Sequence, residues 1–414
     1  MRIAVLCNDT RGGVQPYVAL AMGLRQAGHD VRAVAPSDLA PMFSQLGIPT
    51  AALSGSIQAV LRGSGGVAER GLLTTMRFAA QELPARIEEW TRQTLAACDG
   101  VDILTGGVGG MVIGLSVAEK LNCPFIETHL HPVGAPTAEY PGALIAWTPK
   151  WLGPKALRFS HHITEAIVWA PFKRAMTQAR ENVLGLRGRS KTSRNLPVLY
   201  GFSRHVLPVA QGLTSARHVT GYWSLPTQVG WAPPQRLSAF LDLPGPVVSI
   251  GFGSMASQDP HALARLVRGA ARDAGVRVIL LAGWGGLGMG DPDGTSYCID
   301  EVPHDWLFRR MAAVVHHGGA GTTGAAMTAG VPAVVIPFTM DQPFWAQRAA
   351  HLGVSPPPIP RRRLTQRKLA DALCQTITDT GMRERAARLG KLIRAEDGVR
   401  NAVEILGQVQ ATWA

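Results

Sequence analysis

The stretch HHGGAGTT (316–323) combines residue types that can hold a phosphate group. The apolar run AAVV before it predicts a short buried strand, and GAAM after it predicts a helix that begins near Thr322 or Thr323. Glycines let the backbone come close to an anion, and a helix start supplies unpaired N–H groups and the positive end of a dipole. The two threonines can either cap that helix or bond a phosphate oxygen. The stretch therefore predicts a phosphate cradle.

A carboxylate and an amide follow the next predicted strand, PAVVIPF (332–338), as Asp341 and Gln342. Such a pair can bond neighbouring hydroxyl groups of a sugar. Phosphate at one strand end and a polyol at the next indicate a nucleotide sugar as the ligand.

A second template fits the same glycines. Residues 319–324 spell G-x-G-x-x-G after a strand, with Asp341 about 20 residues further on, as a dinucleotide-binding fingerprint requires. On this alternative the protein would be a dinucleotide-dependent oxidoreductase. The fingerprint does not require the two histidines before the glycines or Gln342 after the acid, and the first strand–helix turn of the chain lacks it.

The elements that must position these residues alternate between strand and helix. IAVLC (3–7) predicts a strand, residues 8–13 a glycine-rich loop, residues 14–27 a helix and VRAVA (31–35) the next strand. This is a βαβ unit of a parallel sheet. Ligands of such sheets lie at the carboxyl ends of the strands, so we expect the loop at 8–13 to face a cleft.

The same alternation begins again after a proline-rich stretch. We therefore predict an α/β protein with two Rossmann-like domains that face each other across a cleft. The predicted parts are a first domain at 1–220, a linker at 221–246, a second domain at 247–390, and a helical segment at 391–414 that can reach back to the first domain.

The composition is that of a globular protein, with 46% hydrophobic and 17% charged residues over 414 residues. The five cysteines are scattered without metal or disulfide spacing, which favours a reducing, cytoplasmic setting. MRIAVLC is too short for a signal peptide, and no apolar run approaches the roughly 20 residues of a membrane helix. The close histidine pairs lack the spacing of a metal centre, so we expect no metal.

The net charge of +12 is concentrated in one segment. Residues 150–217 carry twelve basic residues against two acids, Glu165 and Glu181. The basic residues are Lys150, Lys155, Arg158, Lys173, Arg174, Arg180, Arg187, Arg189, Lys191, Arg194, Arg204 and Arg217. Five aromatic residues accompany them: Trp147, Trp151, Phe159, Trp169 and Phe172. The segment could lie on an anionic membrane or beside an acidic acceptor, or it could be a solvated basic face with its aromatics in the core. No nucleic-acid-binding module is recognisable.

Four motifs together resemble a known family. The longest is VVHHGGAGTTGAAMTAGVPAVVIPFTMDQPFWAQRAAHLGV (314–354), and TRGGVQPYVALAMGL (10–24), GFGSM (251–255) and VPHDWLF (302–308) support it. Over nearly its whole length the chain resembles the family 1 glycosyltransferases of GT-B fold, in the branch of bacterial sterol glucosyltransferase-like and antibiotic glycosyltransferases. The resemblance implies inverting, metal-independent transfer of a sugar from a nucleoside diphosphate to a hydroxyl, or less favourably an amine, of a small-molecule or lipid acceptor. No further cofactor is implied.

The resemblance assigns the diphosphate to one histidine and to the backbone and hydroxyls of the glycine-rich run. These residues are His317, Gly319, Gly321 and Thr322. A helix N-terminus together with a histidine can replace the divalent ion that other transferases use to stabilise a departing diphosphate.

The rest of the donor site follows in the same way. The sugar hydroxyls would bind Asp341 and Gln342, and Gly253 and Ser254 would approach the phosphates from a neighbouring strand end. Residues that would lie beside the nucleotide base are Val302 and His304, with Trp306 or Trp284 as packing walls.

The acceptor side departs from the family at Gly13. At this position the bacterial branch has the aspartate of an R-G-D run, and plant relatives have a histidine. In the family, that aspartate or histidine is the general base that deprotonates the acceptor hydroxyl. Arg11, Gly12 and Gly13 are expected on the acceptor-side loop, and glycine cannot accept a proton there. Asp9 on the same loop is the first substitute, and His129 and His131 on a proline-rich loop are the others, because a near-neutral pKa suits a base.

Three points stay open. An acceptor that is acidic enough, or is assisted by its own groups, would lose its proton without a base from the protein. Alternatively, a chain without a base could be a non-catalytic nucleotide-sugar-binding partner protein. Ala325 stands where plant relatives have a ribose-binding glutamate, so the sequence does not decide whether the donor nucleoside is uridine or deoxythymidine. The expected location is the cytoplasm, with peripheral contact at the inner membrane face through residues 150–217 as an option.

Overall fold

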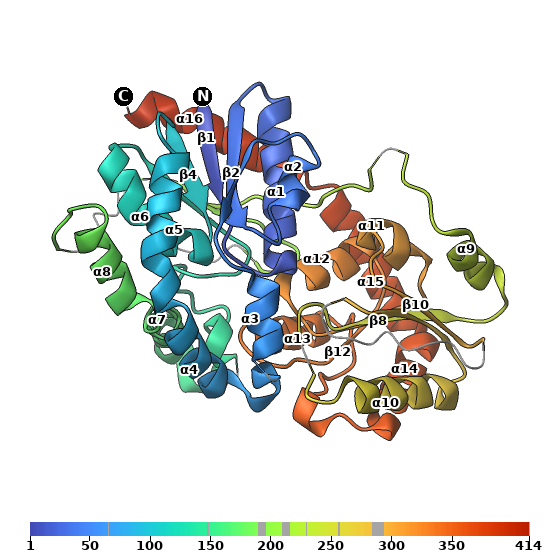
Figure 1. Ribbon diagram of the computed structural model, residues 1–414. Helices are drawn as coiled ribbons and strands as arrows, with labels where there is room; N and C mark the ends of the chain where they lie inside the picture. Colours follow the sequence, from blue (N-terminus) through green and yellow to red (C-terminus); the bar gives the residue numbers. More distant parts are fainter. Residues whose placement is uncertain are drawn as a thin grey trace. The chain divides into compact units, whose positions relative to one another are not determined.

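The chain folds into two compact units in the computed structural model. The residues described are 1–64, 66–146, 149–188, 196–208, 216–228, 230–255, 257–283 and 294–413. The first unit comprises Met1–Val60, Thr75–Leu225 and Glu396–Ala414, and the second comprises Leu61–Thr74 and Pro226–Ala395. Each unit is built around its own parallel sheet (Figure 1).

The described part of the first unit has a seven-stranded sheet of order β3-β2-β1-β4-β5-β6-β7. Its strands are Arg2–Leu6 (β1), Asp30–Pro36 (β2), Thr50–Leu53 (β3), Ile103–Gly106 (β4), Phe125–His129 (β5), Val198–Tyr200 (β6) and Arg217–Val219 (β7). Neighbouring strands run parallel, with β1 between β2 and β4. Central strands such as β1 and β4 are buried almost throughout because helices cover both faces of the sheet.

Helices connect these strands. They are Arg11–Gln26 (α1), Pro41–Ser44 (α2), Ile57–Gly63 (α3), Leu72–Glu82 (α4), Pro84–Ala97 (α5), Val108–Leu121 (α6), Gly153–Trp169 (α7), Lys173–Asn182 (α8) and Gly398–Trp413 (α16). Short 3-10 turns of this unit are Ala143–Ile145 (η2) and Lys150–Leu152 (η3), whereas the turn Val67–Arg70 (η1) belongs to the second unit.

The described part of the second unit has a five-stranded sheet of order β10-β9-β8-β11-β12. Its strands are Val247–Gly251 (β8), Arg277–Leu281 (β9), Ser296–Ile299 (β10), Ala313–His316 (β11) and Ala333–Val335 (β12). Its helices are Gln235–Asp242 (α9), Pro260–Asp273 (α10), His304–Leu307 (α11), Ala320–Ala329 (α12), Gln342–His351 (α13), Gln366–Thr378 (α14) and Thr380–Arg394 (α15), with 3-10 turns Phe308–Arg310 (η4) and Arg361–Arg363 (η5). On one side of this sheet α10 and α14 lie side by side (Figure 1).

The last helix of the chain packs in the first unit. Helix α16 contacts α1, and Figure 1 shows the red helix beside the blue one. The contact is close at Gly23, where an added Cβ would come within 2.3 Å of Val399. Asn401 also donates a side-chain hydrogen bond to the carbonyl of Thr220 (2.8 Å). The C-terminus therefore completes the first unit.

The proline-rich stretch 221–246, predicted as a linker, is divided between the two units. From Pro226 onward it belongs to the second unit and contains α9, whose Leu237 and Phe240 are buried in that unit's core. Thr227 donates to the Asp305 carboxylate from both its backbone N–H (2.8 Å) and its hydroxyl (2.6 Å).

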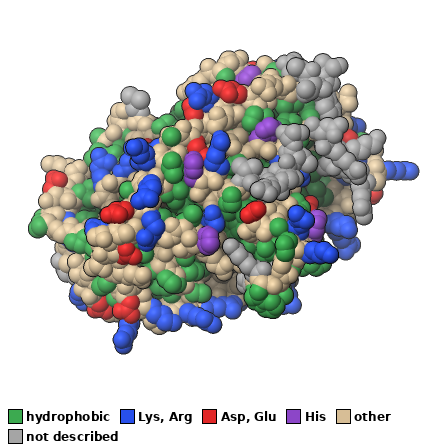
Figure 2. All heavy atoms as spheres, turned by 180° about the vertical axis from the view of Figure 1, so that it is seen from behind, with side chains coloured by type: hydrophobic (Ala, Val, Ile, Leu, Met, Phe, Trp, Pro, Cys, Tyr) green, Lys and Arg blue, Asp and Glu red, His purple; other side chains and the backbone are tan. Residues whose placement is uncertain are grey.

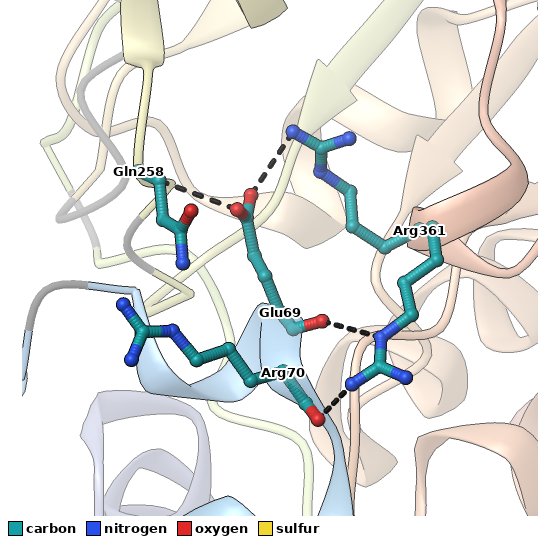
Figure 3. A pocket seen from close by; sticks show the side chains of 5 residues that line it. Glu69, Arg70, Gln258 and Arg361 are labelled. Carbon is teal, nitrogen blue, oxygen red and sulfur yellow. Dashed lines mark hydrogen bonds and ion pairs between the residues drawn. The ribbon is translucent and has the colours of Figure 1, made fainter.

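Residues 61–74, hereafter the 61–74 segment, belong to the second unit although they lie early in the chain. The Glu69 carboxylate binds Arg361 (3.0 Å) and accepts a hydrogen bond from the Ser257 hydroxyl (2.8 Å). Arg362 donates to the backbone carbonyl of Glu69 (2.9 Å). Figure 3 shows Glu69 facing Arg361.

Two helices begin earlier than predicted. Helix α1 starts at Arg11, so the predicted loop at 8–13 is shorter and Arg11, Gly12 and Gly13 form the first helical turn. Helix α12 starts at Ala320. Both helices contain glycines in their first turn, where the N–H groups have no intrahelical partner. Because glycine is unfavourable inside helices, these residues were predicted as loop, and both predicted starts are therefore too late.

Basic side chains are spread over the molecular surface rather than gathered in one area on the face drawn in Figure 2, where Lys and Arg appear in blue between smaller groups of acidic residues. Among the described helices, none is both long and apolar enough to cross a membrane.

Candidate functional site

The candidate acceptor-side residues lie at the carboxyl edge of the seven-stranded sheet. Asp9 follows β1, and His129 is the last residue of β5, which is separated from β1 by β4 alone. The sequence placed His129 on the proline-rich loop, and the structure instead makes it a strand residue that is 1% exposed. His131 lies in the bend that follows and is half-buried.

The Asp9 carboxylate occupies the space in front of Gly13. A Cβ added at Gly13 would lie 2.3 Å from Asp9 Cγ and 2.4 Å from Oδ2, whereas a Cβ at Gly12 would meet nothing within 4 Å. Asp9 is exposed and its Oδ1 accepts a hydrogen bond from the Thr10 N–H (2.5 Å). A carboxylate beside the first turn of α1 is favoured by the helix dipole. Asp9 therefore places a carboxylate at the position from which a side chain of residue 13 would start.

A tyrosine that the sequence analysis missed lies close to this carboxylate. The Tyr17 hydroxyl of α1 donates to the carbonyl of Thr128 in β5 (2.5 Å). Burial raises the pKa of Tyr17 well above its usual value, and the charges of Cys7 and Asp9 add to that rise. Tyr17 thus stays neutral and ties α1 to β5. Tyr17 follows Gly13 by four residues, which is about one helical turn, so the spacing could have shown that both lie on one face of the helix.

His129 is held by a carboxylate that was also missed. Its Nε2 lies 3.0 Å from Glu127 Oε2, and its Nδ1 is buried without a hydrogen-bond partner in the described part of the chain. Burial opposes ionisation of Glu127, but the hydrogen bond and charge of His129 and the charge of Arg217 outweigh it, so the pKa of Glu127 lies below its usual value. The spacing i, i+2 puts both side chains on one face of the strand, which could have revealed the pair.

The candidate donor-side residues meet at the carboxyl ends of β8 and β11. Gly253 has φ +58, and a Cβ there would lie 3.0 Å from Cε1 of the His317 ring. A Cβ at Gly319 would lie 2.5 Å from Nε2 of the same ring. The half-buried imidazole therefore sits between two glycines, and any larger residue at either position would push it away. Ser254 beside it is buried.

The two neighbouring histidines are uncharged at neutral pH. Burial lowers the pKa of His316 to about 3, with contributions from His317 and His304. Burial and the charge of His304 lower the pKa of His317 to about 4. His316 Nδ1 accepts a hydrogen bond from the Gly318 N–H (3.0 Å), which fixes its tautomer, whereas His317 Nδ1 is buried with no partner among the described residues.

The start of α12 has no side-chain cap. Gly319 is the N-cap residue and makes no side-chain cap bond, so Ala320, Gly321 and Thr322 occupy the first three helical positions. Their N–H groups have no partner within the helix. Neither threonine caps the helix, contrary to one of the two predicted roles, because both lie inside it. The buried Thr323 hydroxyl has no hydrogen-bond partner in the described chain.

Asp341 and Gln342 stand at the start of α13. The Trp345 indole N–H donates to Asp341 Oδ2 (2.9 Å) and fixes the carboxylate. Gln342 is buried, and its Oε1 accepts from the N–H groups of Phe338 (2.8 Å) and Thr339 (3.2 Å). Gln342 therefore shapes the turn that carries Asp341, a role that the sequence did not suggest.

The predicted neighbours of the nucleotide base lie around α11. Val302 is buried in the core of the second unit, and His304, the first residue of α11, stacks on Phe308 with ring centroids 4.4 Å apart. Trp306 packs edge-on against Trp231 (5.1 Å), so it serves the local core. Trp284 lies outside the described residues.

A small polar cavity of about 250 Å³ lies where the 61–74 segment meets the rest of the second unit (Figure 3). Its lining residues are Glu69, Arg70, Gln258, Arg361 and Arg362. The Glu69 carboxylate already accepts bonds from Arg361 and Ser257, so the cavity is explained by the docking of this segment. Within the described residues, no cluster of His, Cys, Asp and Glu could hold a metal ion.

Known proteins resemble the chain in sequence. Residues 289–406 match the family described as erythromycin biosynthesis protein CIII-like, C-terminal domain. Over 98% of the chain, identity is 32% to a sterol 3-beta-glucosyltransferase of Arabidopsis thaliana and 33% to one of Aspergillus clavatus. The chain spans 65% of the plant relative and 29% of the fungal one.

Solved structures share the fold. The glycotransferase of kitacinnamycin superposes with a TM-score of 0.70 at 19% identity, covering 98% of both chains. Glycosyltransferase VinC in complex with DTDP gives 0.68 at 19% identity and covers 99% of this chain and 100% of its own. SnogD from Streptomyces nogalater gives 0.66 at 21% identity and covers 99% of both chains. The predicted resemblance and the predicted GT-B class of two Rossmann-like α/β domains are confirmed.

Proposed function

We propose that this chain, a homologue of sterol 3-beta-glucosyltransferases with the GT-B fold, is an inverting, metal-independent glycosyltransferase. It would move a sugar from a UDP- or dTDP-sugar to a hydroxyl of a sterol-like or secondary-metabolite acceptor. The observation that carries the proposal is the His317 imidazole held between Gly253 and Gly319 at the start of α12.

The donor diphosphate would bind at this helix start. Ala320, Gly321 and Thr322 offer N–H groups that have no partner within the helix, together with the positive end of the helix dipole. His317 is neutral in the free protein and can donate one hydrogen bond; a diphosphate beside it would favour the charged imidazolium. These donors stabilise the negative charge that develops as the sugar–phosphate bond breaks, which is the task a metal performs elsewhere.

The sugar would bind Asp341. One carboxylate oxygen is fixed by Trp345, and the other can accept from a sugar hydroxyl. The Gln342 side-chain nitrogen contacts the Met255 sulfur (3.2 Å), which leaves one of its two hydrogens for a second hydroxyl.

Asp9 would act as the general base. The acceptor oxygen attacks the anomeric carbon while the bond to the diphosphate breaks, and the hydroxyl proton moves to the Asp9 carboxylate. Asp9 is exposed at the strand edge and fills the position that Gly13 leaves empty. His129 is buried against Glu127, which makes it a weaker choice, and His131 is the remaining one.

The donor site is tested first by thermal unfolding with UDP, dTDP and NAD as separate ligands. We expect UDP or dTDP to raise the unfolding temperature of the wild type, with a much smaller rise for His317→Ala. His261→Ala, at an exposed histidine of α10, is the matched control and should behave as the wild type. Stabilisation by NAD alone would support the oxidoreductase and refute the proposal.

Turnover is tested next by release of nucleoside diphosphate in the presence of sterols and secondary-metabolite aglycones. Transfer with at least one acceptor is expected. If both nucleotides bind yet no acceptor supports turnover, the chain is a nucleotide-sugar-binding partner protein and the proposed activity is wrong.

A further inference from the structure

Three large apolar side chains project from the start of α7 in the first unit. Trp151 is 81% exposed, Phe159 63% and Leu152 47%. Exposed apolar groups that cluster usually mark a place where something binds. Trp151 and Leu152 belong to η3, which runs directly into α7, so the three residues lie within about two helical turns.

These side chains share one face of the helix. Leu152, Lys155 and Phe159 are spaced i, i+3 and i+7, so they follow one stripe. The buried residues of α7, which include Leu157 and Thr164, lie on the opposite side against the rest of the unit. The exposed stripe is thus not needed for the core.

Basic residues accompany the apolar ones. Lys155 and Arg158 are exposed between Leu152 and Phe159, and neither has an ion-pair partner in the described part of the chain. The acid of this helix, Glu165, is half-buried and lies further along it. We call Trp151, Leu152, Lys155, Arg158 and Phe159 the α7 patch.

The aromatics of the basic segment divide into two groups. Trp169 and Phe172 pack against the core of the first unit, as a solvated basic face with buried aromatics would require. Trp151 and Phe159 do not, because most of their surface is exposed. Trp147 lies outside the described residues. The exposed pair needs a different explanation.

We propose that the α7 patch docks the protein on the surface of an anionic phospholipid bilayer. Aromatic rings settle at the boundary between headgroups and acyl chains, and Lys and Arg beside them pair with lipid phosphates. The charges of the patch are all positive, which matches an anionic surface and not a neutral one. This docking does not depend on the proposed glycosyl transfer, and it can be measured without nucleotide or acceptor.

Docking is tested by sedimentation of the full chain with vesicles. Vesicles of phosphatidylcholine with phosphatidylglycerol should bind the wild type, and vesicles of phosphatidylcholine alone should bind it at least about tenfold more weakly. The apolar variant Trp151→Ser/Phe159→Ser and the charge variant Lys155→Glu/Arg158→Glu should each lower binding to the anionic vesicles by about tenfold or more.

Matched controls come from α15 in the second unit. Arg388→Glu/Lys391→Glu changes the net charge equally, and Leu392→Ser removes an apolar side chain that is 44% exposed. Both should bind vesicles as the wild type does. All these residues are exposed, so the unfolding temperatures should agree with the wild type. Equal binding to neutral and anionic vesicles, full binding by either patch variant, or an equal loss in the controls would overturn the proposal. An apolar variant that binds vesicles normally but uses a soluble acceptor poorly would make the patch an acceptor wall instead.

Discussion

Substitution of Gly13 by alanine should lower activity without removing any functional group. The new Cβ would lie 2.3 Å from Asp9 Cγ, against 3.4 Å for an ordinary contact, so the carboxylate must move by about 1 Å. The new Cβ would also lie 2.8 Å from Asp9 Cβ, which a change of side-chain rotamer cannot relieve, so the backbone beside Asp9 must shift as well. Alanine favours a helix over glycine by up to about 1 kcal/mol, which offsets part of that cost. Stability should therefore change little while catalysis falls.

The expected loss in kcat is about 10- to 100-fold, because misplacing a reacting group by about 1 Å can cost that much. Asp9→Asn removes the base itself and should cost about 100- to 10,000-fold. The assay is initial-rate release of nucleoside diphosphate at saturating donor, together with thermal unfolding of each variant.

Two controls isolate the effect. Gly12→Ala places the same methyl group one residue away in open space and should leave kcat unchanged. Asp30→Asn alters an exposed aspartate at the start of β2, on the opposite edge of the sheet from Asp9. The double variant Asp9→Gly/Gly13→Asp should recover part of the activity, since it returns a carboxylate to the same space. Normal turnover by Asp9→Asn would refute the reasoning and pass the role to His131 or to the acceptor.

Further predictions concern the second unit. His317→Ala should lower transfer by at least about tenfold, and Gly319→Ala should lower it similarly because its Cβ would lie 2.5 Å from the His317 ring; unchanged rates would remove the ring from the site. Because the pKa values of His316 and His317 are lowered in the folded protein, the unfolded chain binds more protons than the folded one below about pH 6.5. The free energy of unfolding should therefore be highest above that pH and should decrease as the pH falls toward 4. Urea unfolding across this range should show a smaller loss for His317→Asn, and equal losses would contradict the lowered pKa. Glu69→Gln leaves Arg361 without its counter-ion and should destabilise the second unit by about 1–3 kcal/mol in urea unfolding, with faster proteolysis at 61–74; an unchanged midpoint would show that the pair contributes nothing.

The order of strands and helices could be predicted because their signals are local. Short apolar runs predicted β1, β2, β11 and β12, and the glycine-rich run predicted the start of α12 to within three residues. The proximity of His317 to Gly253 followed only from the resemblance, because it depends on β8 and β11 being neighbours in the sheet. Sheet order is a long-range property that periodicity does not encode.

The details missed by the sequence are those set by side-chain packing. Asp9 filling the space of Gly13 requires the first turn of α1 to start at Arg11, and the pattern had placed a loop there. The pairing of His129 with Glu127 depends on β5 extending to His129. Composition could not distinguish the exposed Trp151 from Trp169, which packs against the core, since both are aromatic residues in one basic segment.

The 61–74 segment makes the second unit discontinuous in sequence. A chimaera that joins the first part of this chain to the second part of a relative at a single crossover near residue 225 would separate Glu69 from the Arg361 with which it pairs. In a hybrid of that design, the contact between the 61–74 segment and the rest of the second unit would not match, and the hybrid should fold poorly. Exchange of donor preference between relatives therefore calls for two inserts moved together, residues 61–74 and residues 226–395, with the C-terminal helix left in the host.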